Sequence, residues 1–533
     1  MQPYALTVDK FLDHAAKWCG ERQVVTAEAG RATGRIGYAA LRERSNRLSG
    51  ALAALGLSPG DRIATLAWNT QHHLEVYYAI MGAGMVCHTL NPRLTAAHLA
   101  AMINEAEDRA IAVASSLAPL AAELALLCPS VEHVLLLDGE TGAPAQLTVQ
   151  TARVWSYEAL LSEHGAPTLW GEFDEETPAG LCYTSGTTGQ PKGVLYTHRS
   201  NYLHTLRALQ ADACGLTGND VVLVAVPMFH ANGWGLPFAA PAVGAKLVLP
   251  GRNMDGLSLV RLMREEGVTI AFGVHTVWLG VLDQLAEAGG ELPDLKRVTI
   301  GGSSCPDTLI RRMEEGFGAQ VQTSWGMTEL SPLGTIAPYN AREGRASGRP
   351  PIGLDLKLTD EDGITLEPQR GVVGRLKVKG ASVIDRYFKA EDDALDSEGY
   401  FDTGDLASLD QDGNLTICGR AKDLIKSGGE WINPAEIEGI VGLHPTVGLV
   451  AVIGRPDPKW GERPVLIVEA RQGRSVDIEG VLDGLRGKVP AWWFPDLVVE
   501  IAAMPLAATG KIDKNRLRAD YASGEGGDER SNS

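Results

Sequence analysis

The chain has 533 residues, 44% hydrophobic and 21% charged, and its 48 basic and 66 acidic side chains give a formal net charge of −18. A single hydrophobic core stops growing at about 250–300 residues, so we expect more than one domain, and the composition excludes a largely disordered chain. The negative charge disfavours nucleic acid and anionic membrane surfaces as partners, because like charges repel.

The seven cysteines are scattered, odd in number and without CxxC spacing. This pattern predicts neither a disulfide framework nor a zinc site and favours a reducing, cytoplasmic location. The N-terminus carries charge too early for the apolar core of a signal peptide. Residues 221–245 contain no charged side chain, but Pro227, Pro237 and Pro241 interrupt them. We therefore expect a buried strand, a loop and a helix there rather than a membrane span.

Short apolar runs alternate with helical periodicity between about residues 175 and 335. Strands are expected at 181–184, 221–226, 246–249, 269–274, 297–300 and 321–325. Helices are expected from residue 201 onward and at 256–266, 276–288 and 306–316. Such alternation predicts βαβ units, an α/β fold and a largely parallel sheet, in which ligands bind beyond the carboxyl ends of the strands.

The pattern changes after residue 350. Short strands and the tight turns DEDG, DSEG and DQDG between residues 352 and 418 predict a β-rich subdomain. Further along, helices near 434–442 and 476–487 and strands at 447–454, 465–470 and 497–501 predict a small α+β unit. The polar, glycine-rich and serine-rich tail from residue 522 predicts disorder.

The clearest motif is a loop rich in glycine and hydroxyl side chains at 183–193, directly after a predicted strand. Its sequence is YTSGTTGQPKG. Backbone N–H groups and hydroxyls of this kind can wrap a polyphosphate, and Lys192 adds positive charge. The loop is not a Walker A motif, because Lys192 follows Pro191 and Gly193 stands where that motif carries Ser or Thr. A polar turn between strands is the alternative interpretation.

Further loops follow in a characteristic order: GGSSCP (301–306), WGMTE (325–329), YFDTGD (400–405), GRAKD (419–423), KSGGEW (426–431) and TGK (509–511). With them, the chain from 1 to about 520 resembles the adenylate-forming superfamily, which includes AMP-forming acyl-CoA synthetases. Within it, MFHANGWGLPF (228–238), SWGMTELSP (324–332) and SGGEWINPAEIE (427–438) resemble medium- and long-chain fatty acyl-CoA synthetases and 3-methylmercaptopropionate ligases.

The resemblance implies a large multi-sheet N-terminal domain (1–419) with parallel sheets and a β-rich subdomain. It also implies a small mobile α+β C-terminal domain (420–523), hinged near 420–423 where Lys422 lies, and a tail (524–533). The implied reaction has two steps. A carboxylate attacks the α-phosphate of ATP, with Mg²⁺, to give an acyl-adenylate and pyrophosphate, and the thiol of coenzyme A then displaces AMP.

Residues for ATP are carried over by motif. The implied ATP contacts are Thr184, Ser185, Gly186, Thr187, Thr188, Gly189, Lys192, Gly302, Ser303, Trp325, Gly326, Thr328, Asp405 and Arg420. Asp405 suits the ribose hydroxyls, because a carboxylate offers several acceptor sites. Glu329 is the implied Mg²⁺ ligand, with Thr184 beside it. Lys511 is implied to bridge the acyl carboxylate and the α-phosphate, where two anions must meet.

Residues for the acid and for coenzyme A are also implied. His230, Trp234, Val274 and Ser304 are expected around the acyl group, with His230 in a catalytic role. Lys426, as a further catalytic residue, and Gly428, Gly429, Glu430 and Trp431 are expected along the pantetheine channel. The chain departs from the family pattern at His275, where proline is expected, and this affects the pocket floor and hence chain length.

Alternatives stay open at the level of sequence, among them a luciferase-type oxygenase. The enzyme could load a carrier protein, although no carrier domain follows residue 520 and MFHANGW lacks an aspartate for an α-amino group. It could retain only the thioester-forming step. A non-enzymatic nucleotide-binding protein is disfavoured, because Lys511, Glu329 and Asp405 are all present. The expected partners are a small carboxylic acid, ATP and coenzyme A, with a homodimer as the candidate assembly.

Overall fold

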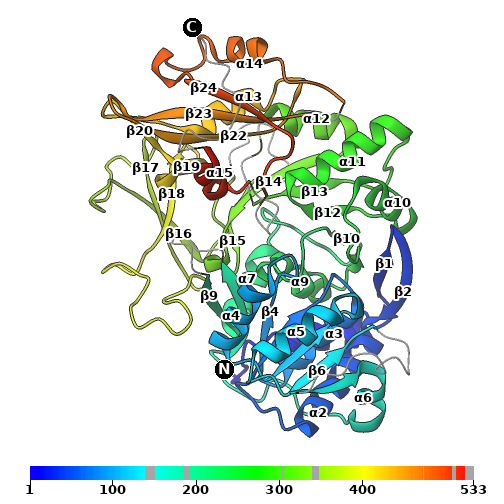
Figure 1. The fold of residues 1–533 in the computed structure, drawn as a ribbon. Helices are drawn as coiled ribbons and strands as arrows, with labels where there is room; N and C mark the ends of the chain where they lie inside the picture. The colour runs from blue at the N-terminus through cyan, green and yellow to red at the C-terminus, as the bar shows by residue number, and fades with distance from the viewer. Residues whose placement is uncertain are drawn as a thin grey trace.

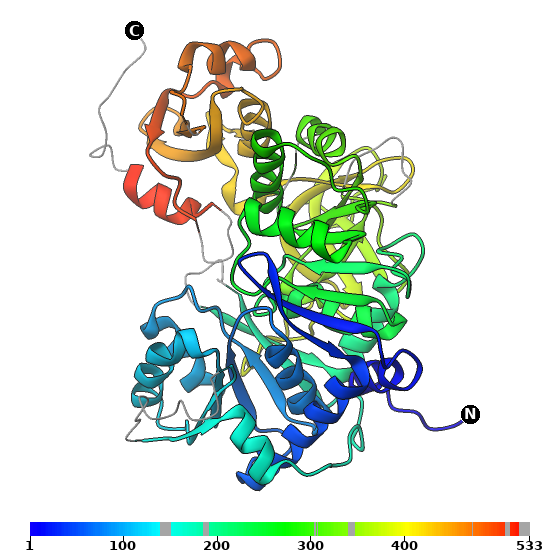
Figure 2. The same ribbon diagram turned by 90° about the vertical axis from the view of Figure 1, so that its right-hand side faces the viewer.

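The computed structural model describes residues 1–138, 151–184, 191–302, 305, 307–338, 347–471, 473–506 and 512–521. The described residues form four sheets, whose arrangement can be followed in Figures 1 and 2. Three of them belong to the large N-terminal part, drawn from blue to yellow, and the fourth belongs to the smaller C-terminal part, drawn in orange and red. The predicted tail lies outside the described residues.

The first sheet has seven strands and is parallel except at one edge. Its order is β7 (Arg153–Ser156), β6 (His133–Leu136), β5 (Ala110–Val113), β3 (Arg62–Leu66), β4 (Val86–Thr89), β8 (Pro178–Thr184) and β9 (Lys192–Thr197). The N-terminal helices are α1 (Asp9–Trp18), α2 (Tyr38–Ala54), α3 (Gln71–Gly82), α4 (Ala96–Ala106), α5 (Ala118–Leu127) and α6 (Tyr157–His164). Every residue of β4, β5 and β6 is buried, as expected for strands of a parallel sheet covered on both faces.

The second sheet has eight strands, and its middle is parallel. Its order is β15 (Leu333–Ile336), β14 (Gln320–Gly326), β13 (Arg297–Ile300), β12 (Ile270–Gly273), β10 (Val221–Val224), β11 (Lys246–Leu249), β1 (Gln23–Glu28) and β2 (Arg31–Gly37). The helices of this region are α7 (His198–Ala208), α8 (Ala231–Trp234), α9 (Leu236–Val243), α10 (Gly256–Glu266), α11 (His275–Ala288) and α12 (Asp307–Phe317). Figure 1 shows the N-terminal β1–β2 hairpin along one edge of this sheet.

These elements confirm the predicted alternation but divide it between two sheets. The strand predicted at 181–184 is β8, which pairs with β4 and not with the strands that follow it. Its antiparallel neighbour β9 was not predicted. The predicted α/β fold with a largely parallel sheet is confirmed for β10 to β14, but β8 belongs to the other sheet, because strand pairing across layers depends on contacts distant in sequence.

Local signals set several helix ends. Thr70 accepts a hydrogen bond from the backbone N–H of His73 at the start of α3, and Asp255 accepts one from Ser258 at the start of α10. Gly267 ends α10 with a positive φ of 65°, which a glycine adopts without strain. As predicted, residues 221–245 form a strand (β10), a loop and a helix (α9); α8 lies in the loop and is not a regular helix, because Asn232 and Gly233 have positive φ. Among the described residues, no helix combines the length and the hydrophobicity needed to cross a bilayer.

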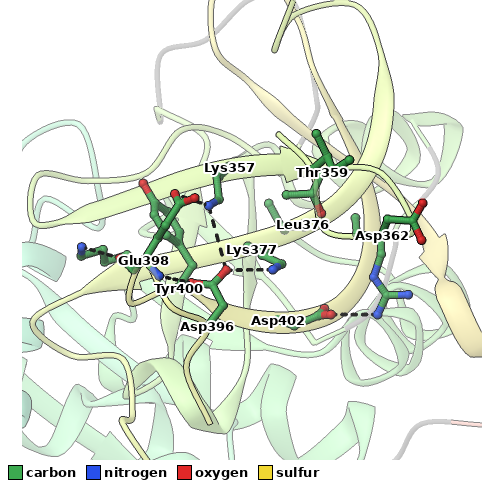
Figure 3. A network of polar contacts seen from close by, with 12 residues as sticks. Lys357, Thr359, Asp362, Leu376, Lys377, Asp396, Glu398, Tyr400 and Asp402 are labelled. Atoms are coloured by element: carbon green, nitrogen blue, oxygen red, sulfur yellow. Dashed lines mark hydrogen bonds and ion pairs between the residues drawn. The ribbon is translucent and has the colours of Figure 1, made fainter. Parts of the chain in front are cut away.

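The third sheet is antiparallel, as the turn-rich sequence predicted. It contains β16 (Leu354–Thr359), β17 (Val373–Gly380), β18 (Phe401–Leu409) and β19 (Leu415–Arg420). Figure 3 shows a polar network on it, in which Asp396 lies 2.8 Å from Lys377 Nζ and Lys357 Nζ lies 2.8 Å from Glu398. This network anchors the turn at 396–399 to β16 and β17, directly before β18.

The C-terminal part begins where the chain leaves β19. Its sheet contains β20 (Ile425–Ser427), β21 (Glu430–Ile432), β22 (Val447–Asp457), β23 (Gly461–Ala470) and β24 (Leu497–Ile501), with helices α13 (Pro434–Val441), α14 (Ile478–Leu485) and α15 (Lys514–Tyr521). The chain changes sheets between Arg420 and Ile425, at the position of the predicted hinge. The domain boundaries themselves, and the mobility of the C-terminal domain, stay predictions.

Candidate functional site

Asp405 contacts two other residues that were predicted to bind ATP, Trp325 and Arg420. Its carboxylate is buried, with 3% of the residue exposed, and it accepts a hydrogen bond of 2.9 Å from Trp325 Nε1. Its other oxygen lies 2.8 Å from Arg420 Nε. Asp405 and Arg420 face each other across the β18–β19 pair, and Trp325 lies near the carboxyl end of β14. The third sheet therefore meets the second sheet at this carboxylate.

Trp325 is a buried residue of the core. Its exposed fraction is 9%, and it packs with the aliphatic side chains of the third sheet. A Cβ at Gly334 would lie 2.4 Å from Trp325 Cε3, so only glycine allows the indole to lie where its N–H reaches Asp405. In this structure the ring orients the carboxylate.

Glu329 forms the second cluster, at the short 3₁₀ turn Thr328–Leu330 after β14. Its Oε1 accepts a hydrogen bond of 2.9 Å from the Tyr387 hydroxyl, and Lys192 Nζ lies 4.8 Å from the centre of the Tyr387 ring. The Tyr196 hydroxyl donates to the carbonyl of Thr328 at 2.8 Å, which ties this turn to β9. Tyr387 thus contacts two of the predicted site residues, Glu329 and Lys192.

Burial dominates the electrostatics of Glu329. It raises the pKa of the carboxyl above its ordinary value, because the charged form loses its hydration. The hydrogen bond from Tyr387 and the charges of Arg420 and Lys192 lower the pKa, but they do not cancel the effect of burial. A carboxylate in this state gains strongly from a cation placed beside it.

The β8–β9 hairpin holds the ends of the glycine-rich loop. Thr184 and Lys192 are paired across the two strands, and the carbonyl of Gly193 accepts a hydrogen bond from the backbone N–H of Phe388 at 2.8 Å. The loop is therefore a connection between strands and not a strand-to-helix turn. Other predicted site residues lie outside the described residues: Ser185, Gly186, Thr187, Thr188, Gly189, Ser303, Ser304 and Lys511.

His230 and Trp234 flank a segment that we name the left-handed turn (Ala231–Gly235). All five residues have positive φ, between 43° at Ala231 and 74° at Gly235. For residues with a side chain this conformation costs roughly 1–2 kcal/mol each, so surrounding contacts must hold it. A Cβ at Gly301 would lie 3.0 Å from Trp234 Cη2, which places the indole against the end of β13.

The remaining acyl and nucleotide positions lie at neighbouring strand ends. Val274 is the N-cap of α11, directly after β12, and Gly302 follows β13 with a φ of 86°. His275 is the first residue of α11, and burial lowers its pKa. Gly326 ends β14, and a Cβ there would lie 2.2 Å from the carbonyl oxygen of Pro332. These positions meet the expectation that ligands bind beyond the carboxyl ends of parallel strands.

The predicted pantetheine residues lie on the β20–β21 hairpin of the C-terminal part. Lys426, Gly428, Gly429, Glu430 and Trp431 are all exposed. The backbone N–H of Gly428 donates to the carbonyl of Trp460 at 2.7 Å, and Lys426 Nζ lies 5.2 Å from the Trp431 ring. The role of this hairpin stays a prediction.

The described residues contain no group of three or more His, Cys, Asp or Glu side chains that could hold a metal by themselves. Mg²⁺, however, is commonly bound by one or two carboxylates together with substrate phosphates and water. Glu329 is a buried carboxylate whose Oε1 accepts from Tyr387. The donor set therefore fits a magnesium ion carried in with a polyphosphate.

The residues that orient the predicted site residues were not predicted from the sequence. Tyr387 lies in the long connection between β17 and β18 and belongs to none of the recognised motifs. Asn69 and Tyr77, which bind the backbone of Met228 before the left-handed turn, come from the connection after β3 and from α3. The sequence carries no signal for these contacts, because they join segments 58 to 159 residues apart.

Comparisons with known protein families agree with this geometry. The family described as AMP-binding enzyme matches residues 11–388, and the AMP-binding enzyme C-terminal domain matches residues 436–511. The 3-methylmercaptopropionyl-CoA ligase of Ruegeria lacuscaerulensis is 42% identical over 98% of both chains. The medium-chain-fatty-acid–CoA ligase of Ectopseudomonas oleovorans is 43% identical over 97% of this chain and 96% of the relative.

A third relative and two solved structures extend the comparison. The long-chain-fatty-acid–CoA ligase of Thermus thermophilus is 38% identical over 99% of this chain and 98% of the relative. ATP-bound MatB from Rhodopseudomonas palustris superimposes with a TM-score of 0.82 at 26% identity, covering 97% of this chain and 99% of MatB. The anthranilate CoA ligase AuaEII shares the fold, with a TM-score of 0.88 at 22% identity over 97% and 98% of the two chains.

Proposed function

This chain belongs to the family of AMP-binding enzymes, and from that premise we propose that its substrate is a fatty or fatty-like carboxylic acid. The enzyme is an AMP-forming acid–thiol ligase. It joins the acid to coenzyme A through an acyl-adenylate and releases AMP and pyrophosphate. The observation that carries this conclusion is the meeting of Asp405, Arg420 and Glu329 at the end of β14.

Three relatives support the proposed class of acid, because their names specify medium-chain fatty acids, long-chain fatty acids and 3-methylmercaptopropionate. Their acids share an apolar tail behind one carboxylate. The segment that follows the left-handed turn is apolar as well, since Leu236, Phe238 and Ala239 are buried. We propose a tail between short and long, with 3-methylmercaptopropionate among the candidates.

In the adenylation step, we propose that Asp405 accepts hydrogen bonds from the ribose hydroxyls of ATP. Two donors orient this carboxylate, and a carboxylate is an acceptor-only group with several acceptor sites, which suits a pair of hydroxyls. Arg420 and Lys192 supply positive charge that lowers the repulsion between the attacking carboxylate and the α-phosphate. Lys511, three residues before α15 in the sequence, is proposed to bridge these two groups.

Glu329 is the residue proposed to hold Mg²⁺. When bound, the ion supplies charge neutralisation on the phosphates of ATP. Tyr387 fixes the orientation of the carboxylate, since its hydroxyl donates to Oε1. Burial of Glu329 excludes water from the side of the carboxylate that faces the core.

For the thioester step, we propose that the C-terminal domain, residues 420–523, rotates about the hinge at 420–423. One site must first hold Lys511 at the phosphate and then open the acyl carbonyl to a thiol, and moving a whole domain exchanges these contacts. The change of sheet between Arg420 and Ile425 supports a hinge at this position. In the second arrangement, Lys426 and the segment 428–431 would line the thiol channel.

The test is an acid panel. Purified enzyme is mixed with ATP, Mg²⁺, coenzyme A and acids from propionate to palmitate, with 3-methylmercaptopropionate included, and AMP, pyrophosphate and thioester are measured. We expect all three products in equal amounts with at least one apolar acid. No AMP and no pyrophosphate with any acid would refute the proposed class of acid.

The same assay separates the alternatives. AMP and pyrophosphate without thioester would indicate an acceptor other than coenzyme A, such as a carrier protein. Thioester from synthetic acyl-AMP, but not from ATP and acid, would indicate that only the second step is retained.

We also propose a cytoplasmic location, which the seven free cysteines support, and a homodimer, which size-exclusion chromatography with light scattering would test.

A further inference from the structure

The left-handed turn (Ala231–Gly235) is held by residues that are far from it in sequence. Five consecutive residues with positive φ, three of which carry a side chain, do not stay in this conformation without external contacts. The strand before the turn, β10, belongs to the second sheet, whereas Asn232 in the turn contacts Cys182 of β8 in the seven-stranded sheet. The main anchors come from the connection after β3 and from α3, in the layer of the seven-stranded sheet.

Asn69 makes three of these contacts. Its Nδ2 donates to the carbonyls of Val224 at 2.9 Å and Val226 at 2.8 Å, and its Oδ1 accepts from the backbone N–H of Met228 at 2.7 Å. The side chain is completely buried, so no water can replace a lost partner without opening the core. With two donors and one acceptor, this one side chain satisfies three backbone groups between the end of β10 and Met228.

Two tyrosines of α3 complete the clamp. The Tyr77 hydroxyl donates to the carbonyl of Met228, and the Tyr78 hydroxyl donates to the carbonyl of Pro237 at 2.8 Å. Both side chains are fully buried. The first anchor lies before His230 and the second lies after Trp234, so the turn is fixed at both of its ends.

These hydrogen bonds of Asn69, Tyr77 and Tyr78, which we call the clamp, determine the position of Trp234. Its indole lies against Gly301 at the end of β13, where even a methyl group would approach Cη2 to 3.0 Å. At Gly235 a Cβ would lie 2.9 Å from His204 Cε1, so the turn is closed against α7 as well. A shift of the turn therefore changes where the indole and His230 stand relative to the strand ends.

We infer that Asn69, supported by Tyr77, is a positioning residue that sets acid affinity and preference by holding the left-handed turn. The part of this inference that concerns the acid rests on the proposed function. The positioning itself does not, because it concerns only the conformation of the turn.

The experiment compares matched pairs of variants. Asn69→Ala is paired with Asn46→Ala, since Asn46 is also buried and also bonds backbone, to Thr168 at 2.7 and 3.1 Å, away from the site. Tyr77→Phe is paired with Tyr38→Phe, since the buried Tyr38 donates one bond to the carbonyl of Ala245. If Asn69→Ala does not fold, the tyrosine pair still tests the inference.

Two measurements are made on each variant. Hydrogen exchange of peptides covering residues 228–238 should be faster in Asn69→Ala and Tyr77→Phe than in their controls. The KM for the acid should rise about tenfold to a hundredfold in Asn69→Ala, with the order of preferred acids changed and the KM for ATP unchanged. The controls should lose stability without either effect.

Equal exchange in the test and control variants would overturn the positioning role, whatever the activity of the wild type. Faster exchange with an unchanged acid profile would overturn the link to acid preference. A wild type that accepts no acid would refute the proposed function instead, and the exchange comparison would still decide whether Asn69 holds the turn.

Discussion

Replacing Asp405 by asparagine removes one charge and keeps the shape of the side chain. The carboxylate accepts from Trp325 at 2.9 Å and pairs with Arg420 at 2.8 Å, and a hydrogen bond to an ionised group contributes about 1.5–3 kcal/mol. The Arg420 side chain is 36% exposed and keeps part of its hydration, so we expect a stability loss of about 2–3 kcal/mol.

The effect on ATP should be separable from this loss. Asparagine offers one acceptor oxygen where two ribose hydroxyls need partners, so we expect the KM for ATP to rise about 10- to 100-fold. The assay is acid-dependent pyrophosphate release at saturating acid, with thermal unfolding measured on the same preparation. The KM for the acid should stay the same.

Glu266→Gln is the matched control. Glu266 is 1% exposed at its side chain and pairs with the 43%-exposed Arg35 at 2.5 Å, on α10 and away from Asp405. It should lose comparable stability and keep the KM for ATP. An Asp405→Asn enzyme with the wild-type KM for ATP would refute our assignment of this carboxylate, and so would an equal rise of KM in the control.

Three further changes test the site. Burial raises the pKa of Glu329, so the rate of adenylation should fall as the pH is lowered and this carboxylate is protonated, at a higher pH than for an exposed glutamate. Tyr387→Phe should move this fall in rate to a still higher pH. A higher Mg²⁺ concentration should move it back to a lower pH. Lys511→Ala should slow adenylation about 10²–10³-fold and spare thioester formation from synthetic acyl-AMP. Gly301→Ala should displace the indole and change acid preference in the same direction as Trp234→Ala.

Each of these has a contradicting outcome. A pH profile that is the same in the tyrosine variant and the wild type would remove that hydroxyl from the site. Equal loss in both half-reactions of the lysine variant would contradict a role confined to adenylation. An unchanged acid preference in both the glycine and the tryptophan variants would show that the indole does not border the acyl group.

Local sequence predicted the elements from residue 220 onward well. Strands such as β13 and β11 and the helix α10 occupy the predicted residues. These segments have periodicity and turn residues that act over short distances, so neighbouring residues suffice to define them. Likewise, β14 and β18 carry Trp325 and Asp405 in motifs that could be recognised before their contact was visible.

The contacts between layers could not be obtained in this way. The separation of β8 from β10 into two sheets depends on β4, and the position of Glu329 depends on Tyr387 in a loop with no motif. The left-handed turn is equally hidden, because Asn232 adopts positive φ readily but Ala231 and Trp234 do not. Its conformation is decided by Asn69, which is 159 residues from the backbone N–H that it binds.

The amino-acid sequence by itself therefore determined the class of chemistry, through short motifs whose residue types suit a nucleotide and a developing charge. The tertiary structure alone decided which side chains orient those motifs. The reason is physical: a motif is a local pattern, whereas the burial of Glu329 and Asp405 and the clamp on the left-handed turn arise from packing between segments distant along the chain.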